Sequence, residues 1–414
     1  MTAADAGIGR RAGGADATEL RRIREGVVYC LKVFIAVRVG LFVLALVSVA
    51  LLPSAVKIPD AASLSIPGPV GVPGWAAHPI TPGWHNVFTV WERFDALWFL
   101  RIADAGYRTG DGSAAFFPGY PLAIRAVSFV LGGRPFAAAM LVSNASMFGA
   151  MCMWYFLTSS ELSERIARTS VLYLAIFPTA FFLFAPYSEA PFLLLSVTAF
   201  WAARRNRWGL AAVAGAGAAL TRNVGLLLVP ALLVEALQQQ REDGGRLLPR
   251  LAGAGAPAVG TFAYLAYWGW RTGDWLTPLT VQQGWQRVPE FPLVTVWRGT
   301  SEAFRWIGTF PGGYHLVDWL IVVPMLVGAA YAAVRFRPTF SAYVWLSLLI
   351  PLSYVFEPRP LMSLPRFAVV MFPLFWAMAD ASERGLVPKA AVVGVSAAGL
   401  GMLALLFANW YYIF

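Results

Sequence analysis

The residues best suited to chemistry lie in a polar and aromatic stretch from residue 91 to 121, WERFDALWFLRIADAGYRTGDGSAAFFPGYP. In a helix, its carboxylate Asp95 shares a face with Trp98 and Phe99, which follow at spacings of three and four. A carboxylate beside aromatic rings can act as a general base toward a hydroxyl of a sugar that packs on those rings. The structural alternative is that Asp95 only pairs with Arg93, Arg101 or a loop amide.

The composition places this stretch beside a membrane. Of 414 residues, 58% are hydrophobic and 13% are charged, which is typical of a polytopic membrane protein. The net charge of +10 comes from arginines in short clusters between apolar runs, where they orient helices, so nucleic-acid binding is not expected. The two cysteines lie in or beside apolar runs and support neither a disulfide framework nor a cysteine-based metal site.

The apolar runs predict an all-α bundle of about 11 transmembrane helices, with a range of roughly 10–13. We expect residues 1–30 to be a basic cytoplasmic leader, disordered at first, and residues 31–414 to be a single transmembrane domain in the plasma membrane. The short apolar piece 122–131 must then be re-entrant or interfacial. The predicted spans are residues 31–52, 136–158, 166–184, 188–203, 207–221, 224–239, 250–270, 316–334, 339–356, 365–381 and 390–409.

This topology gathers the polar and aromatic segments on the outer, extracytoplasmic face. Two outer loops, residues 53–121 and 271–315, are longer than ordinary connectors, so we expect them to form the active-site face. In the first loop, apolar residues recur at spacings of three and four from Phe94 to Ile102. This pattern predicts an amphipathic helix that lies on the membrane surface.

Short segments along the chain carry a more specific signal. In order they are FD at 94–95, IADAGY at 102–107, FFPGYP at 116–121, PYSE at 186–189, RNVG at 222–225, QQGW at 282–285 and PRF at 365–367. Together they resemble the PIG-V type mannosyltransferases, relatives of the second mannosyltransferase of glycosylphosphatidylinositol assembly and members of the GT-C class of polyprenyl-phosphate-sugar-dependent enzymes. Phe94 stands where the family usually has Trp, and Gly119 where Leu is common. Many Ala, Gly and Arg with few Lys indicate a bacterial member.

The resemblance implies that mannose moves from polyprenyl-phosphate-mannose to a hydroxyl of a glycolipid, lipoglycan or protein. A β-linked donor and an α-linked product imply inversion, which needs one carboxylate as base, and we assign that role to Asp95. Arg222 and Arg366 would bind the donor phosphate, since guanidinium matches phosphate oxygens in bidentate fashion. Alternatively, Arg222 anchors a helix end and Arg366 pairs with Glu357.

Glu189 has three candidate roles, which are to hold the acceptor hydroxyl, to orient Arg222 or to bind a divalent cation, and orientation is preferred. No close spacing of histidines and carboxylates predicts a metal site, so no cofactor is expected, with a divalent cation left as an alternative. Further candidates for contact with the substrates are Tyr187, Asn223, Tyr107, Tyr120, Trp98, Gln283, Trp285 and His85.

Two other functions fit part of the pattern. A transporter or flippase for a lipid-linked sugar would place its charges near the membrane midplane, often within internal repeats. Here the polar motifs lie at predicted outer helix ends and no repeat is evident, which favours an enzyme. Transfer of another polyprenyl-phosphate sugar, such as arabinose, also stays open, because a GT-C scaffold does not fix the sugar.

Overall fold

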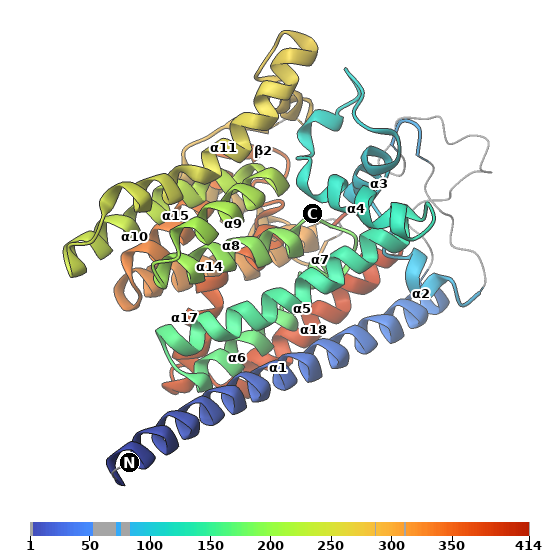
Figure 1. Ribbon diagram of the computed structural model, residues 1–414. Coiled ribbons are helices and arrows are strands. Elements are labelled where there is room, and N and C mark those ends of the chain that lie inside the picture. The colour runs from blue at the N-terminus through green and yellow to red at the C-terminus, as the bar shows by residue number, and fades with distance from the viewer. Residues whose placement is uncertain (1–2, 53–71, 76–82, 286, 310–311, 414) are drawn as a thin grey trace.

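The protein is described by a computed structural model over residues 3–52, 72–75, 83–285, 287–309 and 312–413. These residues form a bundle of helices with one two-stranded sheet (Figure 1), which confirms the all-α prediction. The α-helices are α1 (Ala3–Leu51), α2 (Asn86–Thr89), α3 (Asp95–Ala105), α4 (Gly119–Val130), α5 (Pro135–Glu161), α6 (Glu164–Ala175), α7 (Phe181–Phe184), α8 (Glu189–Arg204), α9 (Trp208–Thr221), α10 (Leu228–Asp243), α11 (Leu247–Thr272), α12 (Thr277–Thr280), α13 (Pro292–Arg305), α14 (Gly312–Arg335), α15 (Pro338–Leu352), α16 (Leu364–Phe367), α17 (Phe372–Glu383) and α18 (Lys389–Ala408). The 3-10 helices are η2 (Ser113–Ala115), η3 (Asn223–Leu227), η4 (Val281–Trp285) and η5 (Ala368–Val370), and the strands are β1 (Arg287–Pro289) and β2 (Tyr354–Phe356).

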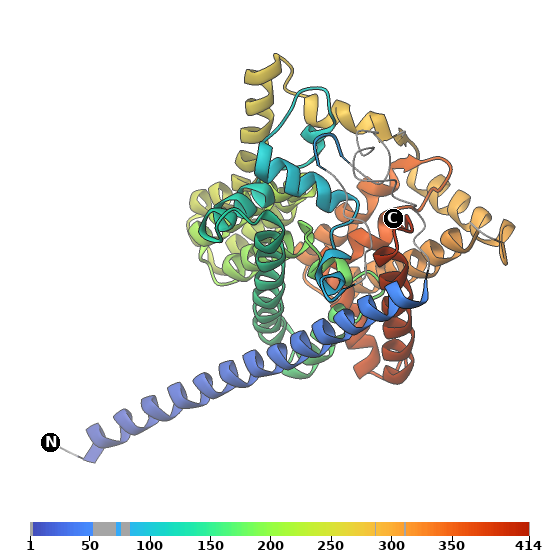
Figure 2. The same ribbon diagram turned by 90° about the vertical axis from the view of Figure 1, so that its right-hand side faces the viewer.

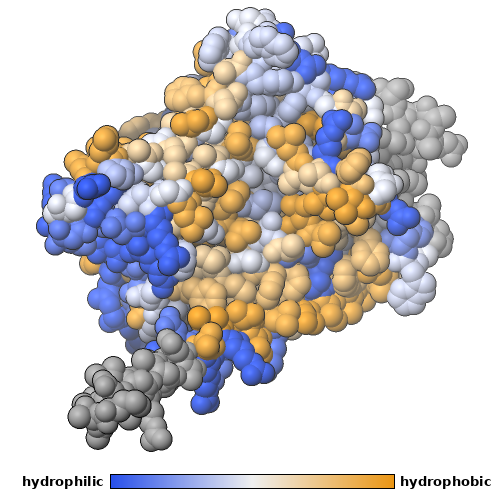
Figure 3. Space-filling model, in the orientation of Figure 1, coloured by the Kyte–Doolittle hydropathy of each residue, from blue (hydrophilic) through white to orange (hydrophobic). Residues whose placement is uncertain are grey.

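Several of these helices can cross a membrane, so the chain is a multi-pass membrane protein. Among the described residues, α5, α14, α18 and the part of α1 from Glu19 to Leu51 are long and apolar enough to cross alone, and the bent pair Leu364–Val370 and Phe372–Glu383 adds a fifth candidate. The apolar helices α4, α9 and α15 are shorter. Hydrophobic residues cover a broad band across one face, and hydrophilic residues gather over the turn between α10 and α11 (Figure 3).

Helix α1 differs from its prediction because the basic leader and the first span form one continuous helix from Ala3, in place of a disordered start. The helix extends past the rest of the bundle at its N-terminal end (Figures 1 and 2). Helices α2, α3 and α4 lie at the other end of the bundle, where the first long loop was predicted.

Three predicted spans are interrupted. Helix α6 stops at Ala175 and α7 starts at Phe181, so residues 166–184 are not one helix. The predicted span 339–356 ends early, because α15 gives way to strand β2. Residues 365–381 form a pair of segments bent by 81°. Pro178, Pro351 and Pro373 lie at or near these breaks, and proline disfavours helix for the residue before it.

Helix α3 is mostly buried within the fold, and the prediction that it lies at the membrane surface stays a prediction. Seven of its eleven residues are buried, including Arg101, whose guanidinium pairs with Asp111 and donates to the carbonyl of Gly106 at 3.1 Å. Gly106 ends the helix with φ +77°, a conformation that favours glycine. The chain therefore neutralises the arginine locally, so that α3 packs against α4 and α5.

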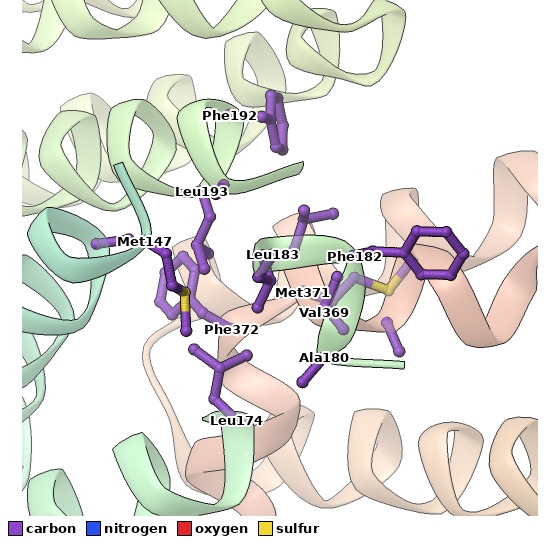
Figure 4. Close-up of a cluster of buried hydrophobic side chains, with 14 of the residues drawn as sticks. Met147, Leu174, Ala180, Phe182, Leu183, Phe192, Leu193, Val369, Met371 and Phe372 are labelled. Atoms are coloured by element: carbon purple, nitrogen blue, oxygen red, sulfur yellow. The ribbon is translucent and has the colours of Figure 1, made fainter. Parts of the chain in front are cut away.

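The apolar core holds the ends of these helices in place. Side chains from α5, α6, α7, α8 and α17 meet in a cluster that includes Met147, Leu174, Leu183, Leu193 and Phe372 (Figure 4). In a membrane the surrounding lipid is as apolar as this core, so close van der Waals packing of these side chains is what holds the helices together. The packing of α7 and η5 against α8 positions the start of α8 and the loop before it.

The two strands connect segments far apart in the sequence. Strand β1 pairs antiparallel with β2, with Arg287 opposite Phe356 and Pro289 opposite Tyr354. The second long loop, predicted at 271–315, is therefore joined to the segment that leads into α16. Much of this loop is helical, since it contains α12, η4 and α13.

Candidate active site

Asp95 is the first residue of α3, where a carboxylate interacts favourably with the helix dipole. Phe94 before it has φ +52°, a conformation that a bulky side chain rarely adopts. Its ring packs against Phe407, Trp410 and Tyr412, with centroids 5.4–5.6 Å apart. The surrounding rings thus hold Phe94 in a strained backbone conformation. Because Asp95 follows directly, this conformation helps to fix the orientation of its side chain.

Asp95 belongs to a row of alternating charges. Its Oδ2 lies 2.5 Å from Nη1 of Arg366, and Nε of Arg366 lies 2.6 Å from Oε1 of Glu189. The same Glu189 oxygen lies 2.7 Å from Nη1 of Arg222, which also donates to Oγ of Ser188 at 3.1 Å. Two carboxylates and two guanidinium groups therefore balance one another. The ion pair of Asp95 is with Arg366 in place of Arg93 or Arg101, and Arg366 pairs with Asp95 and Glu189 in place of Glu357.

The four charged residues of this row come from helix ends. Glu189 is the first residue of α8, Arg222 is the extended residue between α9 and η3, and Arg366 lies in α16. The turn after Arg222 needs Gly225, because a Cβ there would lie 2.4 Å from the Cα of Ala219. The polar segments predicted at 186–189, 222–225 and 365–367 are thus brought together.

The row opens to a small pocket at the Asp95 end. The side chain of Asp95 is 34% exposed, whereas that of Glu189 is fully buried and those of Arg222 and Arg366 are 10% and 13% exposed. The guanidinium of Arg366 lies over the ring of Tyr187, 4.8 Å from its centroid. The pocket is lined by Phe94, Asp95, Phe182, Tyr187, Arg366, Phe407, Tyr412 and Ile413.

Aromatic rings do border Asp95, as predicted, but they are other rings than those expected. Trp98 stacks on Phe116 at 5.4 Å and does not line the Asp95 pocket. Tyr120 is fully buried, and its hydroxyl bonds to Ser143 at 2.7 Å, so it serves the core. Tyr187 does line the pocket, and its hydroxyl is held by the carbonyl of Arg93 at 2.8 Å.

Other predicted contact residues lie away from this pocket. Asn223 is exposed and accepts from the backbone N–H of Val224 at 2.8 Å, and His85 and Gln283 are also exposed. None of the three lines the Asp95 pocket. The side chain of Trp285 lies outside the described residues.

Tyr107 belongs to a second, larger cavity of about 520 Å³. This cavity lies between the end of α3, α4, α9 and α11, has mostly apolar walls and includes Arg125 and Arg271. The hydroxyl of Tyr107 donates to the carbonyl of Phe116 at 2.6 Å, and Arg271 donates to the carbonyl of Tyr107 at 2.8 Å. The tyrosine therefore shapes the wall of this cavity.

Metal ligands are sparse in the described part of the chain, where no group of three or more His, Cys, Asp or Glu side chains could hold an ion. Glu189 accepts from two arginines through Oε1. This geometry fits the orienting role that the sequence favours for Glu189.

The sequence did not indicate every residue at this site. Ser188, which accepts from Arg222, lies in the PYSE segment between Tyr187 and Glu189. Its place in that motif was the one sequence feature that could have indicated its role. Tyr412 and Phe407 lie in or after α18, where the sequence shows no motif. Their contacts with Phe94 arise only from the packing of the last helix against the start of α3.

Several solved structures are similar to this chain at low sequence identity. The chain is similar to the structure of ArnT from Cupriavidus metallidurans bound to undecaprenyl phosphate, with 15% identity over 92% of this chain and 76% of that one, at a TM-score of 0.47. It is also similar to AglB, an oligosaccharyltransferase from Archaeoglobus fulgidus, in complex with an inhibitory peptide and a dolichol-phosphate, with 13% identity over 91% of this chain and 55% of that one, at a TM-score of 0.39. No curated protein sequence matches the chain closely enough to count as a relative.

The match of the sequence to a family model is stronger evidence than these structural similarities. Residues 27–243 match the model of the family described as mannosyltransferase (PIG-V). The matched part is more than half of the chain and includes Asp95, Glu189 and Arg222. The chain therefore belongs to the mannosyltransferase (PIG-V) family of enzymes.

Proposed function

We propose that this enzyme moves mannose from a polyprenyl-phosphate-mannose donor to a hydroxyl of a glycolipid, lipoglycan or protein, with inversion and with Asp95 as general base. The observation that carries the proposal is the exposure of Asp95. It is the one carboxylate of the charged row with access to a pocket, because Glu189 is fully buried and bound by two arginines.

The proposed reaction needs one base. The hydroxyl of the acceptor attacks the anomeric carbon and gives its proton to Asp95, while the bond from that carbon to the phosphate oxygen breaks and leaves its electron pair on the phosphate. An inverting transfer requires no carboxylate nucleophile, and a phosphate leaves without protonation. A correctly placed general base contributes about 10²–10⁴-fold to such a step.

The two motif arginines take different parts in this proposal. Arg366 lines the pocket and uses Nη1 and Nε for the carboxylates, so further N–H groups of its guanidinium can meet a phosphate oxygen. Arg222 lies behind Glu189, and its Nη1 is bound to that carboxylate and to Oγ of Ser188. We therefore assign the phosphate contact to Arg366, and to Arg222 the task of fixing Glu189, which in turn fixes Arg366.

The proposed location of the site is the extracytoplasmic face of the plasma membrane. Helix α8 has Glu189 at its first residue and Arg204 at its last, and Arg205 and Arg207 follow. Clustered arginines favour the cytoplasmic side, which would leave Glu189 and the pocket outside. A reporter fused after Arg205 should be cytoplasmic, and an external reporter would contradict this orientation.

The function is tested with purified wild type and Asp95→Asn, using polyprenyl-phosphate-mannose and a panel of lipid acceptors. Wild type should transfer mannose, and Asp95→Asn should bind the donor without transfer. Asp104→Asn is the matched control, because Asp104 is an exposed carboxylate on the same helix. Transfer by Asp95→Asn at the rate of wild type would remove Asp95 from the chemistry, and wild type that transfers only another sugar would overturn the choice of mannose.

A further inference from the structure

We propose that Arg287 is a further cation of the site and binds the phosphate of the lipid donor and of the lipid product. This inference rests on the proposed function, because it adds a residue to the phosphate subsite of the same pocket. Arg287 lies in β1, within the second long loop 271–315 but outside the short motif segments of the sequence and outside the residues matched by the family model.

Arg287 is tied to the loop that carries Arg366. Its Nη2 donates to Oγ of Ser363 at 2.9 Å, and its Nη1 donates to the carbonyl of Tyr354 at 3.3 Å across the two-stranded sheet. Ser363 begins α16 with φ +72°, and Arg366 follows three residues later. The pairing of β1 with β2 thus places a second guanidinium beside the segment that presents Arg366.

Arg287 does not line the small pocket itself, and its hydrogen bond to Ser363 places it beside the segment that holds Arg366. The charge of Arg366 contributes to lowering the pKa of Arg287 from its ordinary value, although burial is the larger cause. Tyr412, which lines the pocket, interacts electrostatically with Asp95, Arg366 and Arg287. The hydrogen bond to Ser363 and the neighbouring charge of Arg366 therefore place Arg287 beside the pocket and not in its wall.

The balance of charge distinguishes Arg287 from the other arginines of the site. Arg366 and Arg222 are each bound to a carboxylate, so that the row from Asp95 to Arg222 is neutral overall. Within the part of the chain that the structure describes, Arg287 forms no ion pair with a carboxylate, and its hydrogen-bond partners are a hydroxyl and a carbonyl. A half-buried guanidinium without a counter-charge favours an anionic ligand.

The chemistry of the reaction calls for such a cation. The donor is a phosphate diester with one negative charge, and the released polyprenyl phosphate is a monoester whose charge approaches two. The extra charge develops on the phosphate oxygen as the bond to the anomeric carbon breaks, while the proton of the acceptor goes to Asp95. Arg287 can stabilise that charge without first breaking an ion pair with a carboxylate. Its effect is larger for the product than for the donor, because the product phosphate carries more negative charge.

The experiment compares Arg287→Gln with wild type in direct binding of polyprenyl phosphate and of polyprenyl-phosphate-mannose. We expect the affinity of Arg287→Gln for polyprenyl phosphate to fall roughly 10- to 100-fold, with a smaller loss for the donor. Arg298→Gln is the control, because Arg298 is a more exposed arginine nearby in the sequence that pairs with Glu290 and should leave both affinities unchanged. Wild-type affinity of folded Arg287→Gln for polyprenyl phosphate would overturn the proposal.

Ser363→Ala separates a charge effect from a structural one. It removes the hydrogen bond from Arg287 but keeps the guanidinium, so we expect it to retain most of the affinity for polyprenyl phosphate. A loss equal to that of Arg287→Gln would show that Arg287 acts only by holding the loop. If Arg287→Gln does not fold, Arg287→Lys carries the test, because loss of the guanidinium fork should weaken binding severalfold, and unchanged binding would count against the proposal.

These outcomes are distinct from failure of the proposed function. If wild type binds polyprenyl phosphate through Arg287 but does not transfer mannose, the phosphate subsite stands and only the assignment of the sugar is overturned. Mannose transfer by wild type that Arg287→Gln leaves unchanged, together with unchanged binding, would keep the function and overturn the role of Arg287.

Discussion

The two ends of helix α8 both hold buried ion networks, yet only one of them has the features of a site. At the first residue, Glu189 joins two arginines and, through Arg366, reaches Asp95. At the last residue, Arg204 lies 2.7 Å from Glu161 and 2.8 Å from Glu235. The two networks have similar partners, similar distances and similar burial.

The networks differ in what their members can reach. Glu235 is fully buried and also accepts from Gln239 at 2.9 Å, and Arg337 links it to the exposed Glu242. None of these residues lines either of the cavities at the other end of the molecule. Buried ion pairs alone are therefore weak evidence for function, and a charged group with access to a pocket is the better criterion.

The largest effect on activity is expected from Asp95→Asn. Transfer should fall about 10²–10⁴-fold, because the amide cannot accept the proton of the acceptor. Thermal stability should change little, since Arg366 keeps its bond to the buried Glu189. Initial rates and thermal unfolding of the same preparation measure both quantities. If the rate falls only in proportion to the loss of folded protein, Asp95 acts on stability and not on the chemical step.

The next largest effect comes from Glu189→Gln, compared with Glu235→Gln at the other end of the bundle. Each change leaves arginines without their buried counter-charge and should cost about 3–5 kcal/mol in the free energy of unfolding. Only Glu189→Gln should also lower the rate per folded molecule, because it releases Arg366 from its position beside Asp95. A similar loss of specific activity in both variants would show that the two networks do not differ in function.

Arg222→Gln tests whether this arginine binds phosphate or positions Glu189 and Arg366. The sequence assigned a phosphate contact to Arg222, whereas its position behind Glu189 indicates a positioning role. We expect kcat to fall roughly 10- to 100-fold through displacement of Glu189 and Arg366, with the dissociation constant of the donor unchanged. Arg204→Gln, its counterpart at the other end of α8, should leave kcat unchanged. Weaker donor binding by Arg222→Gln would restore the phosphate contact.

Much of the site could be predicted from the sequence because its polar residues stand at the ends of apolar runs. Glu189, Arg222 and Arg366 each occur where a helix begins or ends, and such groups must find partners at the membrane boundary. Which group meets which could not be predicted. The pair of Asp95 and Arg366 joins positions 271 residues apart, and only the packing of the core brings them together.

The errors have physical causes as well. Trp98 lies on the mostly buried helix α3, and Tyr120 lies on the buried face of α4. Periodicity indicates which face is buried, but it cannot decide whether that face meets a pocket or the core. The breaks near Pro178 and Pro373 fall inside continuous apolar runs, so hydropathy alone joined them into single spans, although the prolines were a visible signal. Tyr412 follows the last helix, and nothing in its sequence neighbourhood distinguishes it from a residue at the membrane interface.

The smallest effect is expected from Glu242→Gln, which changes the most exposed carboxylate of the network at the Arg204 end. The side chain of Glu242 is 53% exposed, against 34% for Asp95 at the other end. Its pair with Arg337 at 2.9 Å should contribute about 0–1 kcal/mol to the free energy of unfolding, because water screens exposed charges. Denaturant unfolding and mannose transfer should both resemble wild type. Glu242 is exposed but lines neither cavity, so it cannot contact the substrates there. A clear loss of transfer would therefore mean that the two ends of the bundle are coupled.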